Sequence, residues 1–514
     1  MSVRIVRDFI KFYGAGKTLT LYESSIVRKK NHIFFLIREG LNKKLVILYP
    51  SDAEVPEGFV FEEKGSFPYG RKKFNYVLCP CNSKNASQLR RTFPYTRPQA
   101  IGLRPAIGLG DRLGLATPGH IRAVKEFGVF PVLAQQSIRE MERTQRTPQE
   151  VLDDVSWAVF QEGYRGGFAA DADHLKKESH VDATFAAGFT MYTIDCSDYI
   201  DFEADNYSFN ALKSRFENLP WDEMECDKNR FIRLYKRKRI VLNMPDGEIK
   251  ELKFSEEDLF RAAVKFSRAI IFVTRMYRRL RKLFGRRRFD FEVSIDETEK
   301  PTTPLEHLFL ISEFKRFKVK IHGLALRFVG RFEKAIDYIG DLKEFENSLM
   351  EHILISKRFG PYKISVHSGS DKFSIYPILN KLASNMLHLK TSGTSYLESL
   401  RIVARHDPAL FREIVKYGLE HFQEDRKSYH ISTDLSLIPD PDQVSNEELE
   451  KAFLDSPAGR QVLHVTYGSV LTAKDEEGRW LFRERIKKVL LENEEEFYET
   501  VAAHIKRHIK KCFM

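Results

Sequence analysis

The stretch FAADADHLK, residues 168–176, begins with apolar residues and then places Asp171, Asp173 and His174 within four positions. Its apolar start follows the glycine pair Gly166 and Gly167 and is typical of a buried strand. A buried ionisable group without a partner costs several kcal/mol, on the order of the stability margin of a whole domain. The pattern therefore predicts that other parts of the chain supply partners for these three side chains.

Similar apolar runs recur between residues 100 and 440 and alternate with amphipathic helical stretches. The candidate strands are 105–112, 129–137, 167–174, 189–198, 289–297, 318–328, 362–369 and 386–393. Clear helices are expected at 117–127, at 147–163, and at 395–422, where Pro408 breaks the stretch in two. Repeated strand–helix units predict a parallel sheet, and eight of them match a TIM-type (β/α)8 barrel.

The remaining sequence is arranged around this barrel. We expect a β-rich extension over 1–98, the catalytic barrel over 99–440 and a helical tail over 441–514. The segment at about 199–288 is too long for one crossover, so we interpret it as an insertion after the fourth strand, with a long helix at about 255–283. Within the tail, VLHVTYGSVLT (462–472) is expected to form a strand that includes His464, and the alternative is that His464 folds back over the mouth of the barrel.

Composition limits the functional classes. The 514 residues are 42% hydrophobic and 30% charged, which is ordinary for a globular protein. No apolar run approaches the roughly 20 residues that span a bilayer, and the first residues lack a secretory signal pattern, so the cytoplasm is the expected location. The five cysteines form neither a disulfide framework nor a zinc-ribbon spacing.

The net charge of +11 is concentrated in RLYKRKR (233–239) and RMYRRLRKLFGRRR (275–288). Such runs can bind nucleic acid or another polyanion. In the second run, however, Met276, Leu280 and Leu283 recur at helical spacing, which leaves the basic residues on the opposite face. Since no nucleic-acid motif accompanies the charge, the solvated face of a helix is the favoured interpretation.

Nearly every candidate strand ends in polar or ionisable residues. These are Asp111, Arg112, Gln135, Gln136, Asp171, Asp173, His174, Asp195, Asp296, Glu297, His322, His367, His388 and Lys390. In a TIM barrel the carboxyl ends of the strands meet at one face, where active sites are built. The sequence thus predicts one polar pocket assembled from distant segments.

Imidazoles and carboxylates without thiolates suit Zn, Mn, Co, Ni or Fe(II). We expect His174, His322 and His367 to be metal ligands, together with one carboxylate from Asp173, Asp296 or Glu297. Asp173 and Glu297 are also the candidates for general acid and base. The expected substrate-binding residues are Arg112, Gln135, Gln136, Arg139, Asp195, His388 and Lys390. AIGLGDRLG (106–114) only approximates a dinucleotide fingerprint, so no nucleotide cofactor is expected.

These motifs together resemble the tagaturonate epimerase family of bacterial hexuronate catabolism. The resemblance spans most of residues 100–440. It is carried by GLGDRLGLATPGHI (108–121), QQSIREMERTQRTP (135–148), GFAADADHLK (167–176), TMYTIDCSDYI (190–200), FEVSIDETEKPTTPLEH (291–307), HGLALRFVG (322–330), YKISVHSGSDKFSIYP (362–377) and LHLKTSGTSYLE (387–398).

The resemblance implies a metal-dependent barrel enzyme that interconverts D-tagaturonate and D-fructuronate, and whose relatives act slowly on fructose and tagatose. It implies His174, His322 and His367 as metal ligands and Asp173 and Glu297 as the acid/base pair. The inverted carbon is one position removed from the α-carbon of the ketone, so simple enolisation cannot invert it. Metal-assisted retro-aldol cleavage with re-addition is the leading route, and deprotonation or transient oxidation at that carbon is the alternative.

Other interpretations remain open. A metal-dependent aldose/ketose isomerase or a class II aldolase would show a similar set of strand-end residues, and a sugar sensor without activity could share the fold. A nucleic-acid-binding protein would use the basic runs, but would leave the strand-end acids and imidazoles unexplained. We expect a small-molecule keto-hexuronate as the partner, no nucleic acid and no membrane, and leave assembly into a homo-oligomer open.

Overall fold

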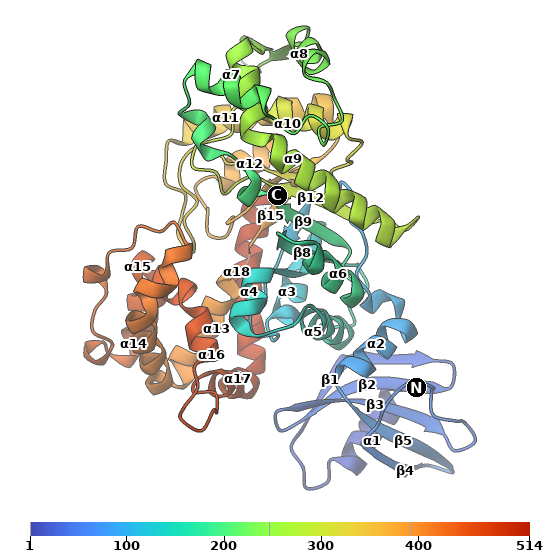
Figure 1. Cartoon of the computed structure of the whole chain (residues 1–514). Coiled ribbons are helices and arrows are strands. Elements are labelled where there is room, and N and C mark those ends of the chain that lie inside the picture. The colour runs from blue at the N-terminus through green and yellow to red at the C-terminus, as the bar shows by residue number, and fades with distance from the viewer. Residues whose placement is uncertain (1, 246, 392) are drawn as a thin grey trace.

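The computed structural model describes residues 2–245, 247–391 and 393–514. Its centre is a closed barrel of parallel strands, with the N-terminal sheet and the C-terminal helices on different sides of it (Figure 1). The barrel strands are β6 (Ala106–Gly108), β7 (Phe130–Ser137), β8 (Ala169–Leu175), β9 (Met191–Asp195), β12 (Asp290–Ser294), β13 (Gly323–Ala325), β14 (Lys363–Val366) and β15 (Leu387–Lys390). All eight predicted strands are present, each shorter than predicted, and β15 pairs with β6 to close the barrel.

Helices follow most of the barrel strands and cover the outside of the barrel. They are α3 (Thr117–Val124), α4 (Ile138–Thr144), α5 (Pro148–Gln161), α6 (Glu178–Ala187), α10 (Pro304–Arg316), α11 (Leu342–Phe359), α12 (Tyr376–Ala383) and α13 (Thr394–His406). Local sequence sets several of their starts, since α5 and α10 begin with a Thr N-cap, a Pro and a Glu that closes a capping box. The predicted break at Pro408 is confirmed, because α14 (Pro408–Asp425) starts there.

The N-terminal part is an antiparallel sheet in the order β1-β2-β3-β5-β4. Its strands are β1 (Leu19–Lys29), β2 (His32–Glu39), β3 (Asn42–Pro50), β4 (Glu63–Tyr69) and β5 (Lys72–Pro80). One face packs on α1 (Ser2–Tyr13) through Phe9. The other face packs on α2 (Ser83–Thr92) and on Phe160 of α5, which joins the sheet to the barrel.

The insertion after the fourth barrel strand is confirmed. It holds α7 (Phe209–Glu217), α8 (Lys228–Lys236), the hairpin β10 (Arg239–Asn243) and β11 (Ile249–Lys253), and the long helix α9 (Glu256–Phe284), and lies at the top of Figure 1. Met276, Leu280 and Phe284 of α9 are buried. As predicted, the basic residues between them lie on the other face, where Arg278 pairs with Glu225 and Arg279 with Asp182.

The C-terminal part is helical, with α15 (Pro457–Val465), α16 (Tyr467–Thr472), α17 (Arg483–Glu492) and α18 (Glu494–Phe513). The predicted strand at 462–472 is wrong: the segment forms the end of α15 and all of α16. The segment is helical despite its β-branched residues, because Leu463, Tyr467 and Val470 are buried at helical spacing on one side. Within the described ranges, the helices are all too short or too polar to cross a membrane.

Candidate active site

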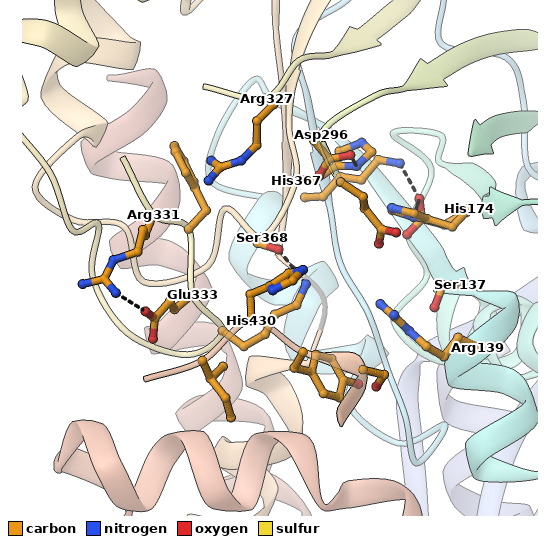
Figure 2. Close-up of a pocket in the computed structure, with 18 of the residues that line it drawn as sticks. Ser137, Arg139, His174, Asp296, Arg327, Arg331, Glu333, His367, Ser368 and His430 are labelled. Carbon is orange, nitrogen blue, oxygen red and sulfur yellow. Dashed lines mark hydrogen bonds and ion pairs between the residues drawn. The ribbon is translucent and has the colours of Figure 1, made fainter. Parts of the chain in front are cut away.

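A cavity of about 710 Å³ opens at the carboxyl ends of the barrel strands. The ends of β7 and β8 and the loops that follow β12, β13 and β14 line it, and a C-terminal segment that includes Tyr429, His430 and Ile431 closes one side. Figure 2 shows His174, Asp296 and His367 converging at one end of this pocket. The volume is in the usual range for a small-molecule site.

His174 reaches the pocket because β8 is distorted at this residue. Asp171 and Asp173 face the barrel interior, so regular alternation would turn His174 outward. The pairing of β8 with β9 shifts register between Ala172 and Leu175, and His174 has φ +55°. A bulge of this kind re-aims a side chain at the cost of a left-handed backbone, and such strain is concentrated at functional sites.

His174, Asp296 and His367 form a three-residue group with potential ligand atoms within 4.8 Å of one another. Nδ1 of His174 lies 2.8 Å from Oδ1 of Asp173, and Nδ1 of His367 lies 3.2 Å from Oδ1 of Asp296. Two buried imidazole nitrogens that face carboxylate oxygens are a donor set that fits a divalent transition metal. Asp195 and Glu297 form a second group with the same His174, also within 4.8 Å.

The other nitrogen of His367 is already oriented by the protein. Its Nε2 lies 2.9 Å from Oε1 of Glu292, a buried carboxylate in the middle of β12. Oε2 of Glu292 lies 3.0 Å from Nδ1 of His388. A carboxylate behind a ligating imidazole is the usual arrangement in metal sites, because it fixes the tautomer and the orientation of the ring.

Lys390 occupies the centre of the barrel and neutralises several carboxylates. Its Nζ lies 2.8 Å from Asp171, 2.7 Å from Asp173 and 3.0 Å from Glu292. Burial alone would lower the pKa of Lys390, but these three charges raise it well above its ordinary value. The ammonium therefore stays protonated and lowers the pKa of Asp173 and Glu292, whereas burial raises the pKa of Asp171 to about 6.

The charges around His174 favour a cation. Burial would lower the pKa of His174, yet Asp173, Asp195 and Glu297 raise it to about 10. Burial would raise the pKa of Asp173, yet His174 and Lys390 lower it well below its ordinary value. This part of the pocket thus stabilises positive charge next to a permanently ionised carboxylate.

The structure brings many of the predicted site residues together. Those that line the pocket are Arg112, Gln135, Arg139, Asp173, His174, Glu297, His367 and Lys390. Asp195 lies behind His174, where its Oδ1 accepts the backbone N–H of Ser197. His388 is buried below the pocket against Glu292.

Two predicted residues lie elsewhere. His322 was expected at the end of a strand, but 318–322 is not a strand, and β13 begins only at Gly323. His322 therefore lies at the opposite, amino end of the barrel, where its Nδ1 accepts the backbone N–H of Phe291. Gln136 points away from the pocket and donates to the carbonyl of Asp111.

Several pocket residues were not predicted. Arg327 and Lys334 come from the long loop after β13, and Tyr429 comes from the C-terminal part. His464 lies in α15 and lines the pocket, as in the less favoured of its two interpretations. Glu292, which contacts His367, is also new. Only Glu292 left a signal in the sequence, as a lone acid at an inward position of an apolar strand.

Asp371, His504 and His508 form another close group, between the loop after β14 and α18. Both nitrogens of His508 are in use, since Nδ1 binds the carbonyl of His504 and Nε2 accepts the backbone N–H of Asp371. Arg460 also pairs with Asp371, at 2.7 Å. This group is a structural network and not a metal site.

Comparison with known proteins places the whole chain in one family. Residues 22–512 match the family model for tagaturonate epimerase. The tagaturonate/fructuronate epimerase of Thermotoga maritima is 45% identical over 505 residues, which cover 98% of this chain and 99% of the relative. A native crystal structure of the fructuronate-tagaturonate epimerase of Cohnella laeviribosi superposes with a TM-score of 0.89 at 38% identity, and covers 98% of this chain and 99% of that chain. A glycerol complex of the same protein has a TM-score of 0.89 at 37% identity, with 99% of each chain covered. This chain belongs to the tagaturonate epimerase family.

Proposed function

We propose that this chain is a divalent-metal-dependent epimerase that interconverts D-tagaturonate and D-fructuronate in hexuronate catabolism. The observation that carries the proposal is the group of His174, Asp296 and His367 at the mouth of the barrel, in a chain whose relatives are named as epimerases of these two substrates. A pocket of about 710 Å³ accommodates a six-carbon keto-acid.

The residues that would hold the metal are His174, Asp296 and His367. When bound, a divalent cation would polarise the ketone and hydroxyl oxygens of the substrate and stabilise negative charge on them. His322, at the other end of the barrel, has no part in this proposal.

The carbon that is inverted bears a hydroxyl and lies β to the ketone, so the substrate is a β-hydroxy ketone. Removal of the proton from that hydroxyl breaks the bond to the α-carbon, leaves an aldehyde on one fragment and places the electron pair on the ketone-bearing fragment. Rotation of the aldehyde and re-addition to its other face give the epimer, and a proton returns to the new alkoxide. No atom is gained or lost in this sequence.

Glu297 is the best candidate for the group that takes up and returns the hydroxyl proton. It is exposed to the pocket, lies in the group with His174, and forms no hydrogen bond or ion pair with the residues that the structure describes. Asp173 is held ionised by Lys390 and His174, so its role is to receive hydrogen bonds and to shape the charge of the site. Gln135 donates to Asp173, while its buried Oε1 has no described partner and is available to a substrate hydroxyl.

Conversion of D-tagaturonate followed by NMR tests this proposal, with wild-type protein that has been stripped by chelator and reloaded with Zn²⁺, Mn²⁺, Co²⁺ or Ni²⁺. We expect D-fructuronate only after reloading, and loss of turnover in His367→Ala and Asp173→Asn. An aldose product would instead identify an isomerase. Absence of turnover with every metal, in folded protein, would refute the epimerase proposal.

The route is tested separately in D₂O. Retro-aldol cleavage predicts that the hydrogen on the inverted carbon is retained and that labelled aldehyde can exchange into the product. Stoichiometric deuterium at the inverted carbon would instead establish proton transfer at that carbon.

A further inference from the structure

Arg139 is a guanidinium without a protein partner at the wall of the pocket. It lies at the start of α4, directly after β7, and is half-buried. Among the described residues it forms no hydrogen bond and no ion pair. Its guanidinium carbon lies 5.2 Å from the centre of the Tyr429 ring. A guanidinium carries five N–H donors and stays charged at any physiological pH, so these donors are available to an anion that enters the pocket.

The other cations of the pocket are largely committed to the protein. Arg112 pairs with Glu140 at 2.9 Å and also donates to the carbonyl of His464. Nε and Nη1 of Arg327 donate to the carbonyls of Thr298, Phe328 and Gly330.

Three further cations line the pocket. Lys390 is surrounded by three carboxylates, and Arg331 lies 3.5 Å from Glu333. Lys334 lacks a carboxylate partner but donates to the hydroxyl of Ser368 at 2.6 Å. Arg139 is therefore the pocket cation with the most unused donors among those that the structure describes.

Tyr429 is the aromatic neighbour of the Arg139 guanidinium. The guanidinium carbons of Arg139 and Arg143 both lie 5.2 Å from the centre of its ring. Nη1 of Arg143 donates to the Tyr429 hydroxyl at 2.9 Å, which fixes the ring. An aromatic stack orients a guanidinium while leaving its edge free for a planar, two-oxygen acceptor.

We propose that Arg139, oriented by Tyr429, binds the carboxylate of the substrate and sets the preference for keto-hexuronates over neutral ketohexoses. The inference rests on the proposed function and adds the residue that binds the carboxylate of the substrate. Arg139 lies at the start of α4, directly after β7, and His174 lies in the neighbouring strand β8. Figure 2 shows both side chains at the pocket, so we expect one ligand to contact both. The carboxylate lies at the end of the substrate remote from the ketone, which allows the acid to be held while the reacting carbons face His174.

The test compares two substrates that differ only at this end, D-tagaturonate and D-tagatose, in wild-type, Arg139→Met and Arg139→Lys proteins. We expect kcat/KM for D-tagaturonate to fall by on the order of 100-fold in Arg139→Met, because a charge-assisted paired hydrogen bond is lost. For D-tagatose we expect a change of less than about threefold. We expect Arg139→Lys to retain part of the preference for D-tagaturonate over D-tagatose, because lysine keeps the positive charge but cannot donate two parallel N–H bonds to a carboxylate.

The matched control is Lys334→Met, which removes another pocket cation that has no carboxylate partner among the described residues. We expect its ratio of the two kcat/KM values to stay near that of the wild type. Equal losses for both substrates in Arg139→Met would indicate a structural role and overturn the proposal. A collapse of the ratio in Lys334→Met, but not in Arg139→Met, would also overturn it.

Direct binding separates this inference from the proposed function. Calorimetric titration with D-galacturonate and with D-galactose requires no turnover. Weaker binding of the acid, but not of the neutral sugar, in Arg139→Met supports the carboxylate site even if no epimerisation is observed. Equal affinity of wild type and Arg139→Met for the acid refutes it.

Discussion

Oε1 of Glu292 lies 2.9 Å from Nε2 of His367, inside a barrel where both side chains are buried. Burial would raise the pKa of Glu292, but Lys390 and His388 lower it well below its ordinary value. The carboxylate is therefore ionised and accepts the Nε2 proton of His367, which orients Nδ1 toward Asp296, whose Oδ1 lies 3.2 Å away. This relationship links the centre of the barrel to the proposed metal group.

Glu292→Gln tests that link. The amide has nearly the same size but no charge, so it no longer fixes the tautomer of His367. We expect affinity for Zn²⁺ or Mn²⁺ to fall by about 10–100-fold, measured by calorimetric titration of chelator-treated protein. Ser365→Ala is the control, because the Ser365 hydroxyl donates to the same oxygen at 3.0 Å without contacting His367. Unchanged metal affinity in folded Glu292→Gln would show that the hydrogen bond does not orient a ligand.

Glu297→Gln tests the proposed acid/base group. A carboxylate that transfers a proton in the transition state typically contributes about 10²–10⁴-fold, so we expect kcat to fall by that factor with little change in KM. Glu299→Gln is the matched control, because Glu299 is also exposed and lines the same pocket two residues away. Similar kinetics for the two variants would remove Glu297 from the mechanism.

The barrel could be predicted from the sequence because the alternation of apolar strand and amphipathic helix is repeated along the chain. Each strand is an apolar run between helices, and errors at one boundary do not change the alternation. His174 and His367 could be placed at the pocket because they follow their apolar runs. His322 was misplaced because the apolar run before it is not a strand, and a single sequence does not show where pairing starts.

The rest of the site depends on tertiary contacts that leave no local pattern. The bulge that turns His174 inward is a change in pairing with β9. Tyr429 and His464 reach the pocket only because the C-terminal helices pack beside the barrel. Their positions follow from docking of whole elements, which periodicity does not encode.

Glu333 joins the loop after β13 to the C-terminal segment that closes the pocket. Its Oε2 accepts the backbone N–H and the hydroxyl of Ser432, both at 2.9 Å, and Nε2 of Gln461 at 3.0 Å. In Glu333→Ala these donors lose their acceptor. We expect faster amide hydrogen exchange across 428–435 and a KM raised by about tenfold, with kcat less affected.

Arg331→Ala is the control for Glu333, since it removes the ion pair at 3.5 Å and leaves the bonds to the tail in place. If exchange at 428–435 is the same in Glu333→Ala and in the wild type, the segment is held by other contacts.

His504 and His508 make the stability of the contact between α18 and the loop after β14 depend on pH. Burial lowers the pKa of His504 to about 4, against the opposing effect of Asp371. Burial and the neighbouring His504 lower the pKa of His508 to about 3. The charged groups that face this pair are Asp371, Glu398, Arg460 and Arg507.

Both histidines are therefore neutral in the folded protein at pH values where the unfolded chain, with its ordinary pKa near 6.5, takes up protons. The unfolded state binds more protons between pH 6.5 and about 4, so the free energy of unfolding must decrease as pH falls through this range, by up to about 3 kcal/mol for each histidine. Replacement of both by Gln should flatten the dependence of Tm on pH between 6.5 and 4, while His430→Gln, at an exposed histidine, should leave the slope unchanged. The measurement is differential scanning calorimetry across this pH range. If the slopes of the double variant and the wild type coincide, protonation of other groups governs acid unfolding.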